Sequence, residues 1–379
     1  MKVNFYERHQ PENQLDYIKD ALLSENLISD GKYDRLLKEH FKTAQGIERI
    51  LFLPSATAAL ELSIQLLGVK PGDEVIIPSF NFPSAANSVL RAGGVPVFCD
   101  IDFSTKNISI EDAETRITPK TRGIIPTHYA GISCDLDALQ LLADRYGLWI
   151  VEDAAQGVES FYKGIPLGTM GEFGAFSFHH TKNFSCGEGG AFLFKDKAML
   201  KKAEILRDNG TNKAEYMKKQ ISSYSWQAAG TSGLLSEACS AVLYSQMLSH
   251  REISAKREQV AKAYDVLLEN ARGIEGKCSR MEIPAYATPN HHIYYINCVN
   301  GKIRDLLKNE LLLAGIDVRS HFNPLHLSDF GKKLGHKGSD LPESVRGAET
   351  LLRLPIHTEM NLHQVEQVVN ALEKAGKKL

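Results

Sequence analysis

From about residue 49, apolar runs of four to six residues alternate with segments that have the period of a helix. The runs are continuously apolar instead of alternating, which is typical of parallel strands buried on both faces. The predicted helices cover 56–67, 83–92, 110–117 and 135–146. The predicted strands are ILFL (50–53), EVIIP (74–78), VPVFCD (95–100), RGIIPTHY (122–129), LWIVED (148–153), AFSF (175–178) and GAFLF (190–194). This rhythm predicts an α/β fold on a large, mostly parallel sheet.

Three regions follow from the same pattern. Residues 1–48 are polar and helical in period, with an irregular break at SENLISDGKY (24–33), and predict an N-terminal helical arm. Residues 49–235 form the large α/β domain. Residues 236–379 predict a long helix and then a small α+β domain.

Within the third region, the long helix is expected over 236–271 and is followed by a strand-like HIYYINC (292–298). Two further helices are expected at 302–314 and 361–376. The stretch 207–235 is the least regular of the chain and is the expected active-site loop.

Composition narrows the class of protein. The 379 residues carry 44 Lys and Arg against 46 Asp and Glu, so the net charge of −2 provides no overall attraction to nucleic acid or to anionic membranes. With 43% hydrophobic and 24% charged residues, the composition is that of a globular protein. The N-terminus lacks the apolar core of a secretory signal, and no apolar run is long enough to span a membrane. The six cysteines form no CxxC pair. We therefore expect a cytoplasmic protein without a disulfide framework.

The segment SFHHTKNFSCGEGG (177–190) places one lysine, Lys182, after a predicted strand and before a glycine-rich turn. A partly desolvated lysine near other cations has a depressed pKa, and its neutral amine can form a Schiff base with an aldehyde. Most lysines in loops are simply solvated, so this segment alone leaves both interpretations open.

Two further segments end at the same predicted edge of the sheet. WIVEDAAQG (149–157) is a buried strand that ends in two carboxylates, of which Asp153 lies 29 residues before Lys182. An acid there suits a pyridine-ring cofactor, because it can hold a proton on the ring nitrogen. PSATAAL (54–60) is a strand-to-helix turn whose small residues leave backbone N–H groups free for a phosphate. Ion pairs and helix caps are the ordinary roles of such residues, so the three segments carry weight only together.

Together, the segments resemble the DegT/DnrJ/EryC1/StrS family of fold-type I, pyridoxal-phosphate-dependent sugar aminotransferases. The resemblance runs over nearly the whole chain and also rests on PGDEVIIPSFNFPSAAN (71–87), THYAG (127–131) and RDNGTN (207–212). Within the family, YKGIPLGTMG (162–171) and HFNPLH (321–326) are similar to the dTDP-4-amino-4,6-dideoxygalactose transaminases.

The resemblance implies roles for residues around pyridoxal 5'-phosphate. Lys182 would bind the cofactor covalently and then carry the proton between cofactor and substrate carbons. Asp153 would pair with the ring nitrogen, and Gln156 would hydrogen-bond the ring hydroxyl. Phe82 would stack on the ring, although without the resemblance it could equally be a core aromatic. The phosphate contacts would come from Ala56, Thr57 and Ser177.

Two positions depart from the family's pattern. Many members carry an asparagine that reaches the phosphate of the neighbouring subunit, at the position aligned with Leu234, which leaves Ser232 to make that contact here. The acid that follows is Glu237 instead of Asp. The resemblance implies that the 207–235 loop crosses to the partner, in a homodimer with shared active sites.

Four histidines invite a metal site, but no HExxH or Cys/His ligand set accompanies them, and no metal is expected. By the resemblance, His321 and His326 are expected to face the substrate instead. The other two histidines are His179 and His180.

The implied reaction is transamination of a nucleotide-linked 4-keto-6-deoxy sugar, dTDP-4-keto-6-deoxyglucose, with L-glutamate as amino donor. The products would be a 4-amino-4,6-dideoxy sugar nucleotide and 2-oxoglutarate, for surface-polysaccharide or lipopolysaccharide biosynthesis. Amination at C3, a UDP-linked substrate and a non-catalytic binding or regulatory protein on the same scaffold remain alternatives. The dehydrating branch of the family replaces the lysine by histidine, whereas Lys182 is present here.

Overall fold

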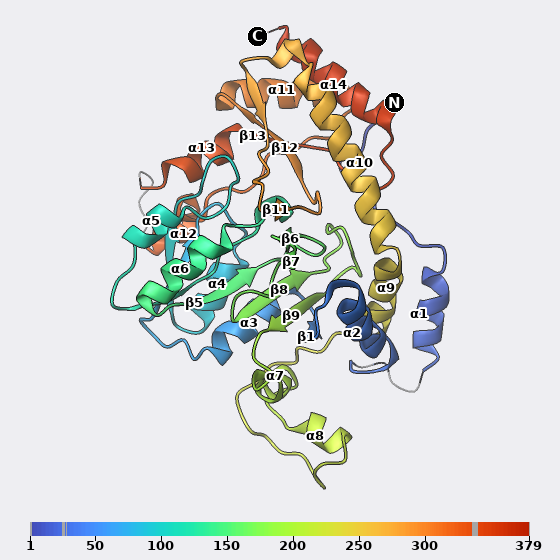
Figure 1. Cartoon of the computed structure of the whole chain (residues 1–379), viewed down its shortest axis with the longest axis vertical. Helices are drawn as coiled ribbons and strands as arrows, with labels where there is room; N and C mark the ends of the chain where they lie inside the picture. The colour runs from blue at the N-terminus through green and yellow to red at the C-terminus, as the bar shows by residue number, and fades with distance from the viewer. Residues whose placement is uncertain (1, 25–26, 28, 336–339, 379) are drawn as a thin grey trace.

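The computed structural model describes residues 2–24, 27, 29–335 and 340–378, and a seven-stranded sheet lies at its centre (Figure 1). The strand order is β1-β9-β8-β5-β4-β2-β3. The strands are β1 (Ile50–Leu53), β2 (Glu74–Pro78), β3 (Val95–Cys99), β4 (Thr121–Ile124), β5 (Trp149–Asp153), β8 (Phe173–Ser177) and β9 (Gly190–Phe194). Each overlaps a predicted run. Strand β4 ends well short of the predicted residue 129, and Pro126, which has no backbone N–H, follows its end.

Most of the sheet is parallel, as predicted. β2 pairs in parallel with β3 and β4, and β5 pairs in parallel with β4 and β8. β9 is antiparallel to both of its neighbours, β1 and β8. The C-terminal ends of the parallel strands therefore meet at one edge of the sheet, where a ligand site is expected in such folds.

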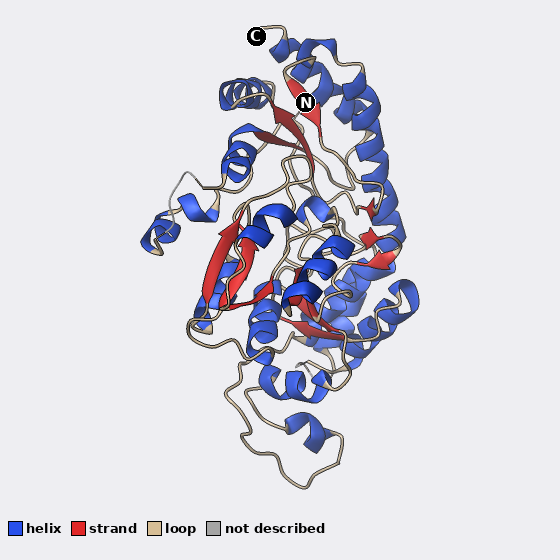
Figure 2. Cartoon of the chain, turned by 60° about the vertical axis from the view of Figure 1, so that its left-hand side comes forward, coloured by secondary structure: helices blue, strands red, loops and turns tan. Residues whose placement is uncertain are grey.

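Helices cover both faces of this sheet (Figure 2). One face packs on α2 (Lys32–Gln45), α6 (Leu136–Tyr146) and α9 (Glu237–Leu248). Successive residues of a strand point to opposite faces of the sheet. In β1, Ile50 and Phe52 therefore belong to this layer. Leu51 and Leu53 face the opposite layer. That second layer is formed by α3 (Ala56–Leu66), α4 (Ser84–Arg91) and α7 (Met199–Arg207).

The C-terminal part has its own sheet, β10-β12-β13, beside α10 (His250–Glu269), α11 (Gly301–Leu313) and α14 (Leu362–Gly376). Its strands are β10 (Cys278–Arg280), β12 (Tyr294–Cys298) and β13 (Leu351–Leu354). The prediction of one helix over 236–271 is wrong, because the chain leaves helical geometry at Ser249 (φ −95°, ψ 12°) between α9 and α10.

The remaining elements are short. A third sheet, β11-β6-β7, joins β6 (Phe161–Tyr162), β7 (Ile165–Pro166) and β11 (Ala287–Thr288). The short helices are α5 (Ile110–Thr115), α8 (Lys213–Met217), α12 (Asp329–Lys333) and α13 (Pro342–Thr350), with 3-10 turns η1 (Tyr129–Gly131), η2 (Arg272–Ile274) and η3 (Leu325–Leu327). In the part of the chain that the structure describes, no helix is both long and apolar enough to cross a membrane.

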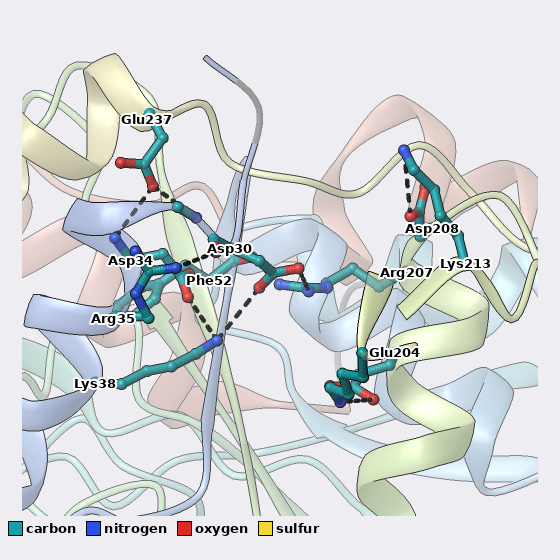
Figure 3. A network of polar contacts seen from close by, with 12 residues as sticks. Asp30, Asp34, Arg35, Lys38, Phe52, Glu204, Arg207, Asp208, Lys213 and Glu237 are labelled. Atoms are coloured by element: carbon teal, nitrogen blue, oxygen red, sulfur yellow. Dashed lines mark hydrogen bonds and ion pairs between the residues drawn. The ribbon is translucent and has the colours of Figure 1, made fainter. Parts of the chain in front are cut away.

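The N-terminal arm consists of α1 (Gln14–Leu22) and α2, and Glu237 holds the start of α2. One carboxylate oxygen of Glu237 accepts the backbone N–H groups of Gly31 (3.1 Å) and Asp34 (3.2 Å) (Figure 3). The other oxygen accepts the N–H of Tyr33 at 2.8 Å. These N–H groups have no partner within their own helix, so the carboxylate acts as the cap of α2. Glu237, which stands where the family pattern has Asp, therefore has a structural role away from the ligand site.

The 207–235 loop begins at a buried anchor. The guanidinium of Arg207 donates to the Phe52 carbonyl of β1 (3.2 Å) and to the Asp30 carboxylate (2.6 Å), as Figure 3 shows. Beyond this anchor, the loop and α8 extend away from the body of the molecule (Figure 1).

Candidate active site

A cavity of about 750 Å³ lies at the C-terminal edge of the parallel strands. Asp153 at the end of β5 and Ser177 at the end of β8 reach it, together with the N-terminus of α3 and segments of the C-terminal part. Of the residues predicted from the sequence, those that line it are Ala56, Thr57, Phe82, Asp153, Gln156, Ser177, Lys182 and His321. The structure thus gathers eight predicted residues, from segments up to 265 positions apart, around one space.

Lys182 lies in the turn after β8, where its backbone N–H donates to the His179 carbonyl at 2.9 Å. Burial is the main reason that the pKa of Lys182 is lowered to about 8; the charge of Asp153 opposes the shift, and that of Arg353 contributes to it. A pKa near 8 leaves a substantial fraction of neutral amine at physiological pH, as a nucleophile or a proton acceptor requires.

Asp153 is buried, with 5% of its surface exposed. Its carboxylate accepts the N–H of Ala155 (3.1 Å) and the hydroxyl of Thr127 (3.4 Å), which are both neutral donors. Burial raises the pKa of Asp153, and these hydrogen bonds and the charge of Lys182 counteract the rise. A buried carboxylate held by neutral donors is suited to a cationic ligand group, such as a protonated ring nitrogen.

The neighbouring carboxylate, Glu152, serves the scaffold. It points to the opposite side of β5 and accepts N–H groups of Gly168 (2.8 Å), Met170 (2.7 Å) and Gly171 (2.8 Å). The His128 ring lies 2.9 Å from it through Nε2. Only one of the two acids in VEDAAQG therefore belongs to the cavity.

Gln156 has its carboxamide oriented by the scaffold. Its oxygen accepts the N–H of Ala130 at 2.7 Å, so its NH₂ group is the end left to donate. Asn290 fixes the backbone beside it, since its amide nitrogen donates to the carbonyls of Gln156 (2.8 Å) and Val158 (2.6 Å). A donor aimed from this wall fits the ring hydroxyl of the implied cofactor.

The N-terminus of α3 forms a cradle of backbone N–H groups at Ala56 and Thr57. Ser55 caps the helix by accepting the Ala58 N–H at 3.1 Å. β9 begins directly against this turn, because a Cβ at Gly190 would lie 2.2 Å from the Ser55 carbonyl carbon. A helix start with free N–H groups binds phosphate through its amides and its dipole.

Phe82 is 60% exposed although its ring lines the cavity. Its backbone N–H donates to the Asn81 side chain at 2.7 Å. The structure does not place it among the core clusters, so the interpretation of a plain core aromatic is wrong. An open aromatic face is available to stack on a planar ligand.

The residues that line the cavity can be compared with the chemical groups of pyridoxal phosphate. The buried acid at Asp153 matches its ring nitrogen, and the amide cradle at α3 matches its phosphate. The donor of Gln156 matches its hydroxyl, and the open ring of Phe82 matches its plane. Lys182 supplies the amine for its aldehyde. The residues present therefore fit this cofactor.

The two histidines of HFNPLH separate in the structure. His321 lines the cavity, and its Nδ1 lies 2.8 Å from the Tyr129 hydroxyl. His326 is 1% exposed in the 3-10 turn η3, and its Nδ1 lies 2.6 Å from the Ser79 hydroxyl. The expectation that His326 faces the substrate is wrong, because the turn after Pro324 directs its ring against β2.

Ser232 also lies outside the cavity. It is exposed in the loop and pairs with Asp208 through an isolated bridge. The assignment of Ser232 to a phosphate contact stays a prediction.

Sequence reasoning missed several lining residues. The N-terminal arm contributes Phe5 and Tyr6, and the C-terminal part contributes Arg257, His292 and Arg353. One signal was available for the last of these: Arg353 is the single charge inside the apolar run LLRLPI (351–356).

No group of three or more His, Cys, Asp or Glu side chains within the described residues could hold a metal ion. His179 and His180 lie next to each other at the cavity, with 3.0 Å between ring nitrogens.

Comparison with known proteins agrees with this geometry. The model of the DegT/DnrJ/EryC1/StrS aminotransferase family matches residues 9–373. An uncharacterized protein of Methanocaldococcus jannaschii is 33% identical over 371 residues, which is 96% of this chain and 95% of that protein. The spore coat polysaccharide biosynthesis protein SpsC of Bacillus subtilis is 30% identical over 368 residues, covering 92% of this chain and 91% of that protein.

Solved structures are similar over the full length. The PLP form of a putative sugar aminotransferase from Streptococcus pneumoniae has a TM-score of 0.90 at 26% identity, covering 100% of this chain and 99% of that one. The aminotransferase TlmJ of Streptoalloteichus hindustanus has a TM-score of 0.90 at 28% identity, covering 99% of both chains. The chain belongs to the DegT/DnrJ/EryC1/StrS aminotransferase family and is a pyridoxal-phosphate-dependent aminotransferase.

Proposed function

We propose that this aminotransferase moves an amino group from L-glutamate to the keto group of a nucleotide-linked 4-keto-6-deoxy sugar, with dTDP-4-keto-6-deoxyglucose as its acceptor. The observation that carries the proposal is the meeting of Lys182, Asp153 and the α3 amide cradle in one cavity. Support for a sugar acceptor comes from the putative sugar aminotransferase of Streptococcus pneumoniae and from SpsC, which is named for polysaccharide biosynthesis.

When bound, pyridoxal phosphate supplies an electron sink for the carbon that loses its proton. Lys182 takes that proton on Nζ and returns it at the neighbouring carbon, which its lowered pKa permits. Asp153 would keep the ring nitrogen protonated, and Gln156 would donate to the ring hydroxyl. The same residues act in reverse order in the second half-reaction, in which the sugar receives the amine.

We place the 207–235 loop in a homodimer with shared active sites. The loop carries large side chains that a monomer would leave in water, with Trp226 77%, Met217 66% and Tyr224 50% exposed. Exposed apolar groups of this size mark a surface for another chain. Ser232 is then the residue of this loop that we assign to the partner's phosphate.

The C4 assignment rests on the resemblance of YKGIPLGTMG and HFNPLH to the dTDP-4-amino-4,6-dideoxygalactose transaminases. Amination at C3 is the second candidate, since the residues around Lys182 serve either carbon. One experiment separates them: purified protein is incubated with L-glutamate and, in separate reactions, with dTDP-4-keto-6-deoxyglucose, its 3-keto isomer and the UDP-linked 4-keto sugar, and each product is analysed by mass spectrometry and NMR. The proposal expects nitrogen at C4 and one 2-oxoglutarate for each aminated sugar. Amination of the 3-keto isomer alone, which would place nitrogen at C3, or of the UDP-linked sugar alone would overturn the assignment.

A further inference from the structure

The C-terminal sheet holds two cysteines that face each other on neighbouring strands. Cys278 begins β10 and Cys298 ends β12, and the antiparallel pairing of these strands places the two residues directly opposite each other. Their sulfur atoms lie 3.4 Å apart. β10 is an edge strand, because the strand order of this sheet is β10-β12-β13. Neither cysteine is among the residues that line the cavity around Lys182.

The register of the two strands suits a disulfide. The backbone N–H of Val299 donates to the Lys277 carbonyl at 2.9 Å, so these two opposed residues form a hydrogen-bonded pair. Hydrogen-bonded and non-hydrogen-bonded pairs alternate along an antiparallel ladder, so Cys278 and Cys298 form a non-hydrogen-bonded pair, with Cα atoms about 4.5 Å apart. A disulfide requires Cα atoms roughly 4.4–6.8 Å apart and sulfurs at about 2.05 Å. The two sulfurs can therefore come into bonding distance by side-chain rotation within the existing strands.

The two thiols differ in their access to solvent. Cys298 is 3% exposed, whereas Cys278 is half-buried. A second cavity, of about 430 Å³, lies beside β10 and is lined by Cys278 together with Arg272 and Arg280. Contact with the Cys278 sulfur and burial raise the pKa of Cys298, which keeps its proton. A small polar oxidant therefore meets Cys278 first, and Cys298 lies behind it as the thiol that can resolve the oxidised sulfur.

Two other roles for these cysteines are less suited to the structure. A free cysteine often only fills space in a core, as Cys99 and Cys134 do among the buried residues beneath the large sheet. Cys278 differs because it borders a cavity and contacts a second thiol. A structural metal needs about four ligands, and no group of three or more His, Cys, Asp or Glu side chains in the described ranges could hold one.

We propose that Cys278 and Cys298 are an oxidisable dithiol, which hydrogen peroxide converts into a reversible disulfide within the chain. The Cys278 thiolate attacks one oxygen of the peroxide, so that an S–O bond forms, the O–O bond breaks and hydroxide leaves. The Cys278 sulfur is thereby oxidised by two electrons to a sulfenic acid. The Cys298 sulfur then attacks it, an S–S bond forms, and the leaving hydroxide takes the Cys298 proton as water. In total, two thiols and one peroxide give one disulfide and two waters.

The disulfide closes the segment 279–297, which supports a wall of the active site. This segment contains β11 and Asn290, whose amide nitrogen donates to the carbonyls of Gln156 (2.8 Å) and Val158 (2.6 Å). Closing a loop stabilises a protein chiefly by restricting its unfolded chain. Oxidation is therefore expected to stabilise the fold, and the inference is independent of the proposed transamination.

The test uses the full-length protein, first reduced and then divided between buffer and hydrogen peroxide. Free thiols are blocked with N-ethylmaleimide, and the protein is digested with trypsin without reduction and analysed by mass spectrometry. Trypsin cleaves after Lys277, Arg280 and Lys302, so the peptides 278–280 and 281–302 separate unless a disulfide joins them. Cys278→Ser and Cys298→Ser are compared with wild type, and Cys298→Ala replaces the second if a buried hydroxyl prevents folding. The matched control is Cys239→Ser, which removes another half-buried cysteine, on α9.

We expect the joined peptide in most molecules of oxidised wild type and Cys239→Ser, and in neither of the other variants. Dithiothreitol should reverse it. The midpoint of thermal unfolding should be about 4 °C higher for oxidised wild type than after dithiothreitol, with no such difference in Cys278→Ser.

Three results would overturn the inference. The first is a peroxide-treated wild type in which both thiols are still blocked by maleimide on separate peptides. The second is oxidation of Cys278 to a sulfinic acid while Cys298 stays a thiol. The third is a joined peptide found only in chains that run as covalent dimers on a non-reducing gel, which would make the bond intermolecular. A joined peptide without a rise in the unfolding midpoint would overturn the stabilising role of the bond.

Discussion

At the scale of single residues, the protonation of Lys182 follows from its surroundings. The ordinary pKa of a lysine is near 10.4, and burial with Arg353 nearby brings that of Lys182 to about 8. Only the neutral amine adds to an aldehyde. The fraction of Lys182 in the neutral form increases as the pH rises through 8, and its reactivity toward an aldehyde increases with it.

We predict that the rate at which cofactor-free protein binds pyridoxal phosphate rises with pH and reaches half its maximum near pH 8. The measurement is the growth of visible absorbance after mixing, from pH 6 to pH 10. In Arg353→Gln the midpoint should move to higher pH, because a neighbouring positive charge has been removed. A midpoint near the ordinary lysine value in wild type would show that Lys182 is not desolvated as described.

Asp153 provides a second prediction. Asp153→Asn keeps the shape and one accepting oxygen, but it replaces the other acceptor with an NH₂ group and cannot neutralise a protonated ring nitrogen. We expect turnover to fall about 100- to 1000-fold with the cofactor still bound and the fold unchanged, the size typical of losing one preorganised electrostatic group. The matched control is Asp305→Asn on the surface, which should have wild-type turnover. Equal turnover in Asp153→Asn would remove Asp153 from the mechanism.

Sequence motifs located those residues that follow directly on a strand or begin a helix, such as Lys182 and Asp153. Arg353 and Phe5 were missed, because their places at the cavity depend on how segments almost 350 positions apart pack together. His326 was misplaced for a similar reason: Pro324 starts a turn that separates it from His321, and periodicity does not reveal the direction of such a turn.

At the scale of elements, the junction of β9 with α3 positions the phosphate cradle. A Cβ at Gly190 would lie 2.2 Å from the Ser55 carbonyl carbon, so Gly190→Ala has to push β9 and α3 apart. We predict a loss of stability of about 1–3 kcal/mol, the usual cost of overpacking. Affinity for pyridoxal phosphate should fall as well, as measured by equilibrium titration. Gly301→Ala is the control, since its nearest contact would be 3.5 Å.

The cap of α2 gives a prediction on stability alone. Glu237→Ala leaves three buried N–H groups of the α2 start without their acceptor, which should cost about 1–3 kcal/mol or more. Urea unfolding measures the change, and Glu366→Ala, a 55% exposed side chain on α14, should be nearly neutral. If Glu237→Ala were as stable as wild type, the carboxylate would not be the cap.

Among the elements, the sequence indicated all seven strands of the large sheet, because strands buried on both faces are continuously apolar. The break at Ser249 and the strand β13 were not predicted. The helical period continues across Ser249 in the residues around it, so only the tertiary packing of α9 and α10 determines the break. β13 is four residues long and directly follows α13, which leaves no turn residue to announce it.

At the scale of the whole molecule, the loop that extends from the body exposes large apolar side chains, as expected of a surface that another chain covers. We predict a homodimer, with a mass by light scattering of twice the 42.0 kDa of the chain. Shared sites also allow complementation between Lys182→Ala and Ser232→Asp, the second of which would repel a phosphate across the interface. Mixed dimers then contain one intact site, and mixing should restore roughly a quarter of wild-type activity. Two inactive variants that stay inactive after subunit exchange, or a fully active monomer, would contradict shared sites.

The central claim is that this cavity accepts an amino group from an amino acid through Lys182. The most direct measurement is the visible spectrum of the holoenzyme before and after L-glutamate is added, with 2-oxoglutarate quantified in the same sample. The account predicts loss of the bound-cofactor band with about one 2-oxoglutarate per subunit in wild type, and no 2-oxoglutarate from a folded Lys182→Ala variant. A band that persists in wild type with every amino acid tried, or 2-oxoglutarate formed at the normal rate by Lys182→Ala, would contradict it.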